Sequence, residues 1–256
     1  MGLSGVTVMP AIVVMWGFCV ASSVAMAGEG DSKAASVVEP VDILKKAAEA
    51  TKQIKFVRYS FQRQGTGSDA EKSPKLSGTA LFGGWRYNTI EKYRVDVKVQ
   101  RPGAEAMEVT AGSDGDVVYL IDHAKKTVYA DMDPAVLGSQ ARTVRSSRIT
   151  DFVEPEPFAD EIKAEKLELK GSVKVGGEEC FEVSAPSGGR RPEIIWFISK
   201  RDSLPRRLDF VFPNPEGTAS GMRMELTDLF VNPKLDGDPF KLIVPEGYVK
   251  TDDFAP

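Results

Sequence analysis

MRMELTDLFVNPKLDGDPFKLIVPEGYVKTDD, residues 222–253, is the stretch of sequence that decides the fold. It begins with an alternation in which Met222, Met224 and Leu226 share one side of a strand and polar residues share the other. The strand ends before Pro233, because proline lacks the amide that a strand's hydrogen-bond ladder requires. No pattern of catalytic groups occurs in this run. It therefore predicts a sheet that binds a ligand rather than one that carries out a reaction.

The first 27 residues differ in composition from the rest of the chain. They contain no charged side chain, and residues 6–20 are almost wholly apolar. Ala25-Met26-Ala27 has the small-x-small pattern of a signal-peptidase site. We therefore predict a signal peptide at 1–27, cleaved after Ala27, a flexible leader at 28–39 and a periplasmic or secreted domain at 40–256. A retained membrane anchor is the alternative, although the apolar core is short for a bilayer span.

The charges of the chain are numerous but balanced. There are 33 basic and 37 acidic residues, which gives a net charge of -4. Binding to nucleic acid needs a clustered basic surface, so we expect no nucleic-acid partner. Cys180 is the one cysteine that remains after cleavage, so an exported domain would have no intrachain disulfide and would depend on its core. The residues around Cys180 predict a buried strand rather than a catalytic thiol.

Hydrophobic alternation predicts a mainly β domain built from antiparallel hairpins. Pro40 starts a helix whose apolar residues recur at helical spacing. Residues 93–100 alternate apolar with polar side chains and give the clearest strand signal. Turns rich in Gly, Pro, Asn and Asp separate about ten strands. The other strands are expected at 56–63, 76–82, 107–110, 117–121, 127–130, 166–175, 180–185, 193–199, 206–212 and 223–231, with a second helix at 133–145 and a loop at 152–160.

The sequence offers little support for catalysis. Its one histidine, His123, falls at the expected tip of a hairpin, where we predict an exposed side chain. The Asp-Gly-Asp triplets at 114–116 and 236–238 lack the full spacing of a calcium loop and are typical of turns. The sequence contains no nucleophile elbow, phosphate-binding loop or dinucleotide fingerprint. We expect no enzyme activity, no metal and no cofactor.

Four passages occur in an order that is typical of one known group of proteins. The passages are a helix leading into Ser60-Phe61-Gln62, then Gly78-Thr79-Ala80-Leu81-Phe82 followed by the tract Trp85 to Val99, then Ser113-Asp114-Gly115 before Val117-Val118-Tyr119, and finally Leu229 to Asn232 with Asp238-Pro239-Phe240 and Val244 to Val249. In these features the chain resembles the LolA-like group of envelope proteins, which comprises the periplasmic carriers of outer-membrane lipoproteins and their relatives. The resemblance runs over about residues 40–253.

This resemblance implies an incomplete β-barrel. A strongly curved antiparallel sheet would be closed on its concave face by the N-terminal helix and short helices, around an apolar cavity that accepts acyl chains. The carriers have an arginine after the second strand that holds a lid closed, and Arg86 and Arg94 are both candidates for that role. The residues that we expect to line the cavity are Tyr59, Phe61, Leu81, Val95, Val97, Trp196, Ile198, Leu208, Phe210, Met222 and Met224.

The leading functional hypothesis is an exported protein of the cell envelope that binds a lipid or lipoprotein acyl chain as a monomer. The alternative is a protein-interaction or envelope-sensing module on the same fold, with an envelope protein as its partner. A lipid hydrolase or transferase is the third hypothesis, and the single histidine counts against it. Bound lipid in purified protein would separate the first hypothesis from the other two.

Overall fold

The computed structural model describes residues 38–86, 89–132, 146–186, 192–212 and 219–253, and it describes side chains at neither end of the 87–88 gap, from 84 to 91. The predicted signal peptide, its cleavage site, most of the leader and the predicted helix at 133–145 therefore lie outside the described residues. Among the described residues, no helix has both the length and the hydrophobicity needed to cross a bilayer.

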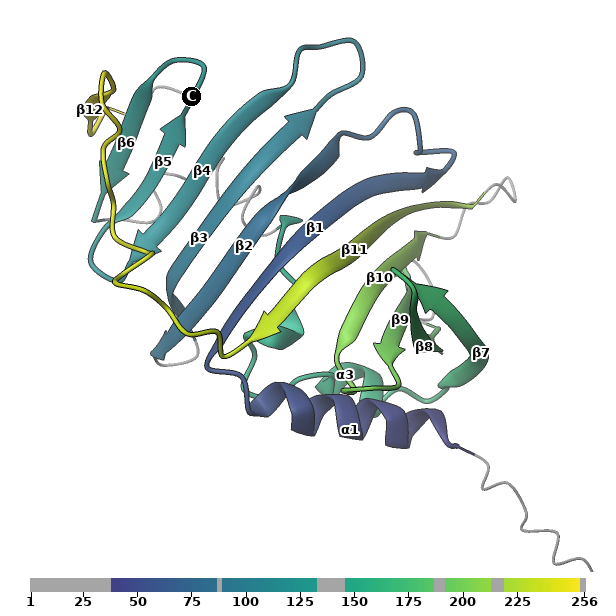
Figure 1. Cartoon of the computed structure of the whole chain (residues 1–256). Helices are drawn as coiled ribbons and strands as arrows, with labels where there is room; N and C mark the ends of the chain where they lie inside the picture. The colour runs from purple at the N-terminus through teal and green to yellow at the C-terminus, as the bar shows by residue number, and fades with distance from the viewer. Residues whose placement is uncertain (1–37, 87–88, 133–145, 187–191, 213–218, 254–256) are drawn as a thin grey trace, which may run out of the picture. The chain divides into compact units, whose positions relative to one another are not determined.

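The described residues form one sheet of twelve strands (Figure 1). The strands are β1 Phe56–Gly67, β2 Lys75–Arg86, β3 Thr89–Gln100, β4 Met107–Asp114, β5 Val118–Asp122, β6 Thr127–Asp131, β7 Glu168–Val175, β8 Glu178–Ala185, β9 Glu193–Ser199, β10 Pro205–Phe212, β11 Ser220–Val231 and β12 Val249–Thr251. Their order in the sheet is β12-β6-β5-β4-β3-β2-β1-β11-β10-β9-β8-β7. The sheet is curved and does not close, so the prediction of a mainly β, incomplete barrel is confirmed.

The sheet consists of two meanders joined at a central seam. Strands β1 to β6 form the first meander and β7 to β11 the second, and each neighbouring pair is antiparallel. β1 pairs with β11, which brings residues far apart in sequence side by side. β12 pairs with β6 in parallel, an exception to the expected antiparallel pairing. The sequence pattern missed β12 because a strand of three residues is too short to show alternation.

Helices α1 and α3 and the 3₁₀ helix η1, among the described residues, lie against one face of this sheet. Helix α1, Pro40–Lys52, begins with proline at its first position, and its apolar stripe, including Ile43 and Leu44, is buried. The 3₁₀ helix η1, Thr150–Phe152, and helix α3, Ala159–Ile162, occupy the region expected to be a loop. Residues 153–158 form the expected loop, but the helical residues at its two ends were missed because elements of three and four residues show no periodicity. Figure 1 shows α1 running beside α3 at one end of the strands.

The strand register divides side chains between two faces. Tyr59, Ala80 and Val95 lie opposite one another on β1, β2 and β3, and they share one hydrophobic cluster with α1. We call this face, which the helices cover, the inner face. The outer face carries the alternate residues, among them Arg58 and Arg94. Burial of the apolar inner face against the helices is the main source of stability of this fold.

The C-terminal segment 232–248 packs on the outer face rather than closing the end of a half-barrel. Asn232 starts it: its side-chain oxygen accepts hydrogen bonds from the amides of Lys55 and Phe56, at 2.6 and 3.1 Å. The hydroxyl of Tyr119 then donates to the carbonyl of Phe240 at 2.9 Å. In Figure 1 the segment runs past the strand ends and reaches β12 beside β6. The segment therefore covers outer-face residues of β5 and β6.

Candidate functional site

The inner face brings together all but one of the residues predicted to line a cavity. The register of β10 and β11 places Met222 opposite Phe210 on this face. The remaining members that gather there, in or against a single hydrophobic cluster, are Tyr59, Phe61, Val95, Val97, Trp196, Ile198, Leu208 and Met224. Whether they bind a ligand stays a prediction, but their common placement follows from the alternation of each strand.

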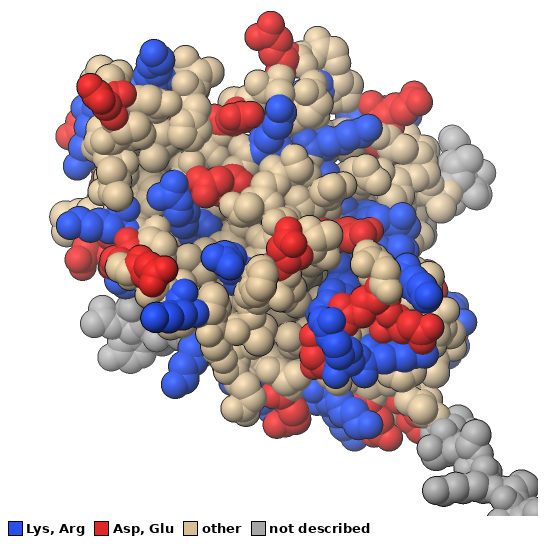
Figure 2. Space-filling view, viewed as in Figure 1, with Lys and Arg blue, Asp and Glu red and all other residues tan. Residues whose placement is uncertain are grey.

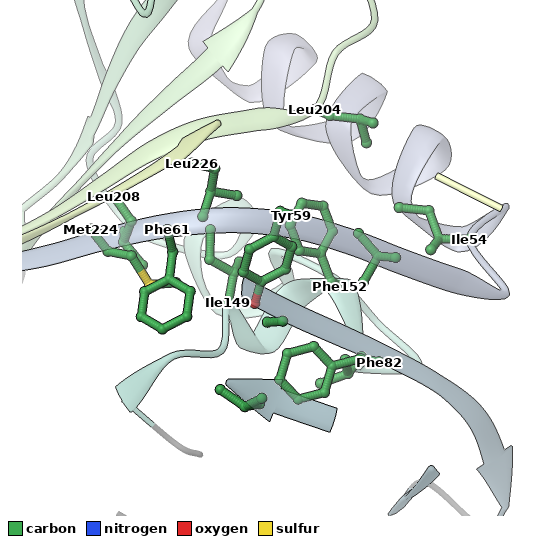
Figure 3. Packing of buried hydrophobic residues seen from close by; sticks show 14 of the residues in the cluster. Ile54, Tyr59, Phe61, Phe82, Ile149, Phe152, Leu204, Leu208, Met224 and Leu226 are labelled. Carbon is green, nitrogen blue, oxygen red and sulfur yellow. The ribbon is translucent and has the colours of Figure 1, made fainter. Parts of the chain in front are cut away.

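One half of this set is a packed core. Tyr59 is 1% exposed, and its ring lies 5.9 Å from that of Phe152 and 6.2 Å from that of Phe82. Its hydroxyl donates to the carbonyl of Ser147 at 2.8 Å, and burial raises the pKa of Tyr59 well above its usual range. Figure 3 shows this packing beneath α1. A ligand would have to displace these side chains to reach this half.

Trp196 anchors the helical cover to the sheet. Its ring packs edge-on against Phe158, with centroids 4.9 Å apart, and its indole nitrogen donates to Glu161 at 3.0 Å. Phe158 has a left-handed backbone conformation immediately before α3, which turns the chain toward the sheet. Trp196 is 2% exposed, so its indole nitrogen is buried with a hydrogen-bond partner.

The other half of the set is accessible only at its far end, because Phe61, Leu208 and Met224 are themselves 2%, 7% and 4% exposed. Phe61, Leu208 and Met224 lie at the end of the cluster away from α1 (Figure 3). Beyond them on the same face, Phe210 and Met222 are only half-buried. Phe212, the next alternate residue of β10, is 39% exposed. An apolar strip thus continues past the helical cover, as a ligand site requires and a closed core does not.

A pocket of about 680 Å³ lies between the η1–α3 region and strands β8 and β9. Ala185 and Ile194 form part of its apolar wall, and Ile194 is the cross-strand partner of Phe210. Asp151 lines the pocket and is 6% exposed. Burial, followed by the charge of Glu161, raises the pKa of Asp151 to about 7, although its carboxylate accepts a 2.7 Å hydrogen bond from the amide of Phe158.

Arg63 is an inner-face residue that the sequence predictions missed. Its cross-strand partners are Leu76 on β2 and Met224 on β11, and both are buried. The strand alternation indicates its face, because Tyr59 and Phe61 are two residues apart and the next position on the same face is 63. The residues predicted to line the cavity are all uncharged, and Arg63 is not among them.

Leu81 and Arg94 lie on the outer face. Leu81 pairs with Arg58 and Arg94 across the strands, which corrects the expectation that it shares a cavity face with Val95. Arg94 forms an ion pair with Asp96 at 3.3 Å, on the side of the sheet away from the helices, so it is not placed to hold a lid over the inner face. Arg86 ends β2, and its side chain lies outside the described part.

Leu81 and Arg94 instead help to form a hollow of about 560 Å³ on the outer face. Leu235 and Pro239 of the C-terminal segment bound its other side. The lining carries both positive and negative side chains. Figure 2 likewise shows basic and acidic residues intermixed over the surface in view.

His123 is half-buried and hydrogen-bonded, so the prediction of an exposed hairpin tip is wrong. Its Nε2 lies 3.0 Å from the hydroxyl of Thr110, and its Nδ1 lies 3.1 Å from the hydroxyl of Tyr248. Since Thr110 donates its proton to Asp96 at 2.6 Å, Nε2–H of His123 must donate to Thr110. This direction is the reverse of a catalytic triad, in which histidine accepts the hydroxyl proton.

Cys180 is the buried strand residue that the sequence predicts. It is fully buried on β8, and burial raises the pKa of its thiol to about 11. Nucleophilic attack needs the thiolate, which is scarce near neutral pH at such a pKa.

No family model and no curated protein sequence matches this chain. Comparison with solved structures returns LprF from Mycobacterium bovis, at 12% identity and a TM-score of 0.47 over 82% of this chain and 97% of that one. It also returns the Mycobacterium tuberculosis lipoprotein LppX, at 10% identity and a TM-score of 0.45 over 77% and 97% of the two chains. A LolA superfamily protein from Nitrosomonas europaea matches at 10% identity and a TM-score of 0.35, over 80% and 99%. The group that the sequence motifs resemble is thus among the structures returned, at a similarity that carries no information on ligands.

Proposed function

We propose that this protein binds the acyl chain of a lipid or lipoprotein along the inner face of its open sheet, in the cell envelope, and does not catalyse a reaction. The observation that carries the proposal is the apolar strip that extends beyond the helical cover, where Phe210 and Met222 are half-buried and Phe212 is 39% exposed. The envelope location rests on the predicted signal peptide. The buried thiol of Cys180 and the donor direction at His123 support a role without catalysis.

The strip is suited to an extended hydrocarbon chain. Each methylene removed from water contributes about 0.8 kcal/mol, so burying about eight of them gives ~6 kcal/mol. That corresponds to a dissociation constant on the order of tens of micromolar before any headgroup contact. The thioether of Met222 is flexible and fits chains of different length and unsaturation.

Filling the strip is expected to weaken binding of an acyl chain. Met222→Trp should displace the acyl chain from the strip. Gln62→Trp adds similar bulk at an exposed outer-face position of β1 and should leave binding unchanged. Titration with a fluorescent fatty acid should show at least a tenfold rise in the dissociation constant for Met222→Trp alone, equivalent to about 1.4 kcal/mol.

Organic extracts of the purified wild-type protein provide an independent check. Mass spectrometry should find acyl lipid in the extract at a fixed ratio to protein. Absence of lipid from the extract, together with no binding of the fluorescent fatty acid by the wild-type protein, would rule out the proposed function.

A further inference from the structure

In the part of the chain that the structure describes, Arg63 is the basic residue whose strand position falls on the inner face within the proposed acyl-binding strip. It follows Phe61 on the same side of β1, and Met224 is its partner on β11. Met222 is the next residue of β11 on that side, opposite Gly65. Arg63 therefore lies at the central seam, beside the buried Met224 and one inner-face position from the half-buried Met222.

Within the described residues, Arg63 has no hydrogen bond or ion pair. This distinguishes it from other arginines of the sheet: Arg94 pairs with Asp96, Arg206 with Glu178, and Arg223 with Asp209. Burial lowers the pKa of Arg63, and no carboxylate opposes that effect. An arginine that is half-buried without a partner costs stability, because its guanidinium loses water without gaining a counterion.

We propose that Arg63 binds the anionic headgroup, a carboxylate or a phosphate, of an acyl-chain amphiphile whose chain lies along Met222 and Phe210. The planar guanidinium presents paired N–H donors that match two oxygens of either group. This inference rests on the proposed function and defines its ligand class. It also gives the ligand an orientation, with its head at the seam and its tail toward the end of β10.

The alternative is that Arg63 only lays its aliphatic stem on the apolar face and keeps its head in water, as long basic side chains commonly do. The two cases differ in what the charge does. In the alternative, an apolar side chain of similar length would bind every amphiphile equally well. In the proposal, the charge distinguishes anionic from neutral ligands that have the same tail.

The test compares palmitate, hexadecyl phosphate and hexadecanol, which share a chain of sixteen carbons, on the purified protein at pH 8. Arg63→Met removes the charge and keeps the length of the side chain, and Arg63→Lys keeps the charge. Displacement of a fluorescent fatty-alcohol probe measures the affinity for each of the three ligands. Acetate and inorganic phosphate, which have no chain, test whether the headgroup alone is sufficient.

We expect Arg63→Met to raise the dissociation constants of palmitate and hexadecyl phosphate about tenfold or more. The dissociation constant of hexadecanol should change less than about twofold. Arg63→Lys should retain much of the preference for anions, and acetate or inorganic phosphate should not displace the probe. The melting temperature of Arg63→Met should be equal to or above that of the wild type, because an unpaired charge is removed.

Three results would overturn this inference. The first is an equal loss of affinity for all three ligands in Arg63→Met, and the second is no change in the affinity for any of them. The third is displacement of the probe by acetate or inorganic phosphate as effectively as by palmitate, which would indicate a free-anion site. If the wild type binds none of the three amphiphiles, the proposed acyl-chain function itself fails. That result differs from the three above, so failure of the proposed function and failure of the Arg63 inference are distinguishable.

Discussion

Replacing Asp151 with asparagine is expected to raise the free energy of unfolding at pH 8 by up to about 4 kcal/mol and to leave it nearly unchanged at pH 4. The folded-state pKa of Asp151 is about 7, against an ordinary value of 3.8. Well below pH 3.8 the carboxyl is protonated in both folded and unfolded chains, and at pH 4 partial ionisation of the unfolded chain changes the free energy of unfolding by less than about 1 kcal/mol. As the pH rises from 4 to 7, the unfolded chain loses this proton first, so the stability that the protonated group contributes falls across that window.

Asparagine should remove this loss, because it carries no charge and its side-chain oxygen can still accept the amide hydrogen of Phe158. Urea unfolding at pH 4, 6 and 8 measures the effect. Asp160→Asn is the matched control, since Asp160 lines the same pocket but is exposed. If Asp151→Asn raises the free energy of unfolding equally at pH 4 and pH 8, ionisation of the buried Asp151 is not what destabilises the fold, contrary to this prediction.

Trp196→Ala is expected to lower the free energy of unfolding by about 4 kcal/mol, because it opens a cavity where the helical cover meets the sheet. The loss includes the ring contact with Phe158 and the hydrogen bond to Glu161. Trp196→Phe keeps most of the apolar contact and removes only the donor, so it should cost about 1–2 kcal/mol. Chemical denaturation followed by circular dichroism measures both values.

The structural role of Trp196 also predicts which residues lose local stability in Trp196→Ala. Hydrogen exchange should increase in residues 150–163, which form η1 and α3, more than in β2 and β3. If Trp196→Ala and Trp196→Phe have equal effects, the hydrogen bond to Glu161 and not the packing would be the main contribution, contrary to this expectation.

The sequence predicts most of the inner face because alternation is a local property. Residues such as Val95 and Val97 alternate with charged neighbours, and the sheet buries them as expected. Leu81 was misplaced because its neighbours Ala80 and Phe82 are also apolar, so that hydrophobicity alone does not assign a side. Only the pairing with Arg58 and Arg94 decides its face, and pairing is a long-range property.

The remaining differences have the same origin. The partner of His123 at Tyr248 is 125 residues away in sequence, and no local pattern connects the two. The short elements η1, α3 and β12 are set by tertiary contacts rather than by periodicity. Arg63 differs from these cases, because the alternation of β1 alone places it on the inner face, although the predicted cavity lining contained only uncharged residues.

The central seam between β1 and β11 also constrains the order in which this chain folds. Each meander pairs neighbours in sequence, but the seam joins Val57 to Val231 and must wait until the eleventh strand is available. Closing a loop of that length is entropically costly and slow, and until then β1 and β10 are unpaired edges open to association with other chains. The strand order therefore leaves these two edges exposed until β11 is placed between them. An amphiphile bound across the seam would join the two meanders and slow their separation.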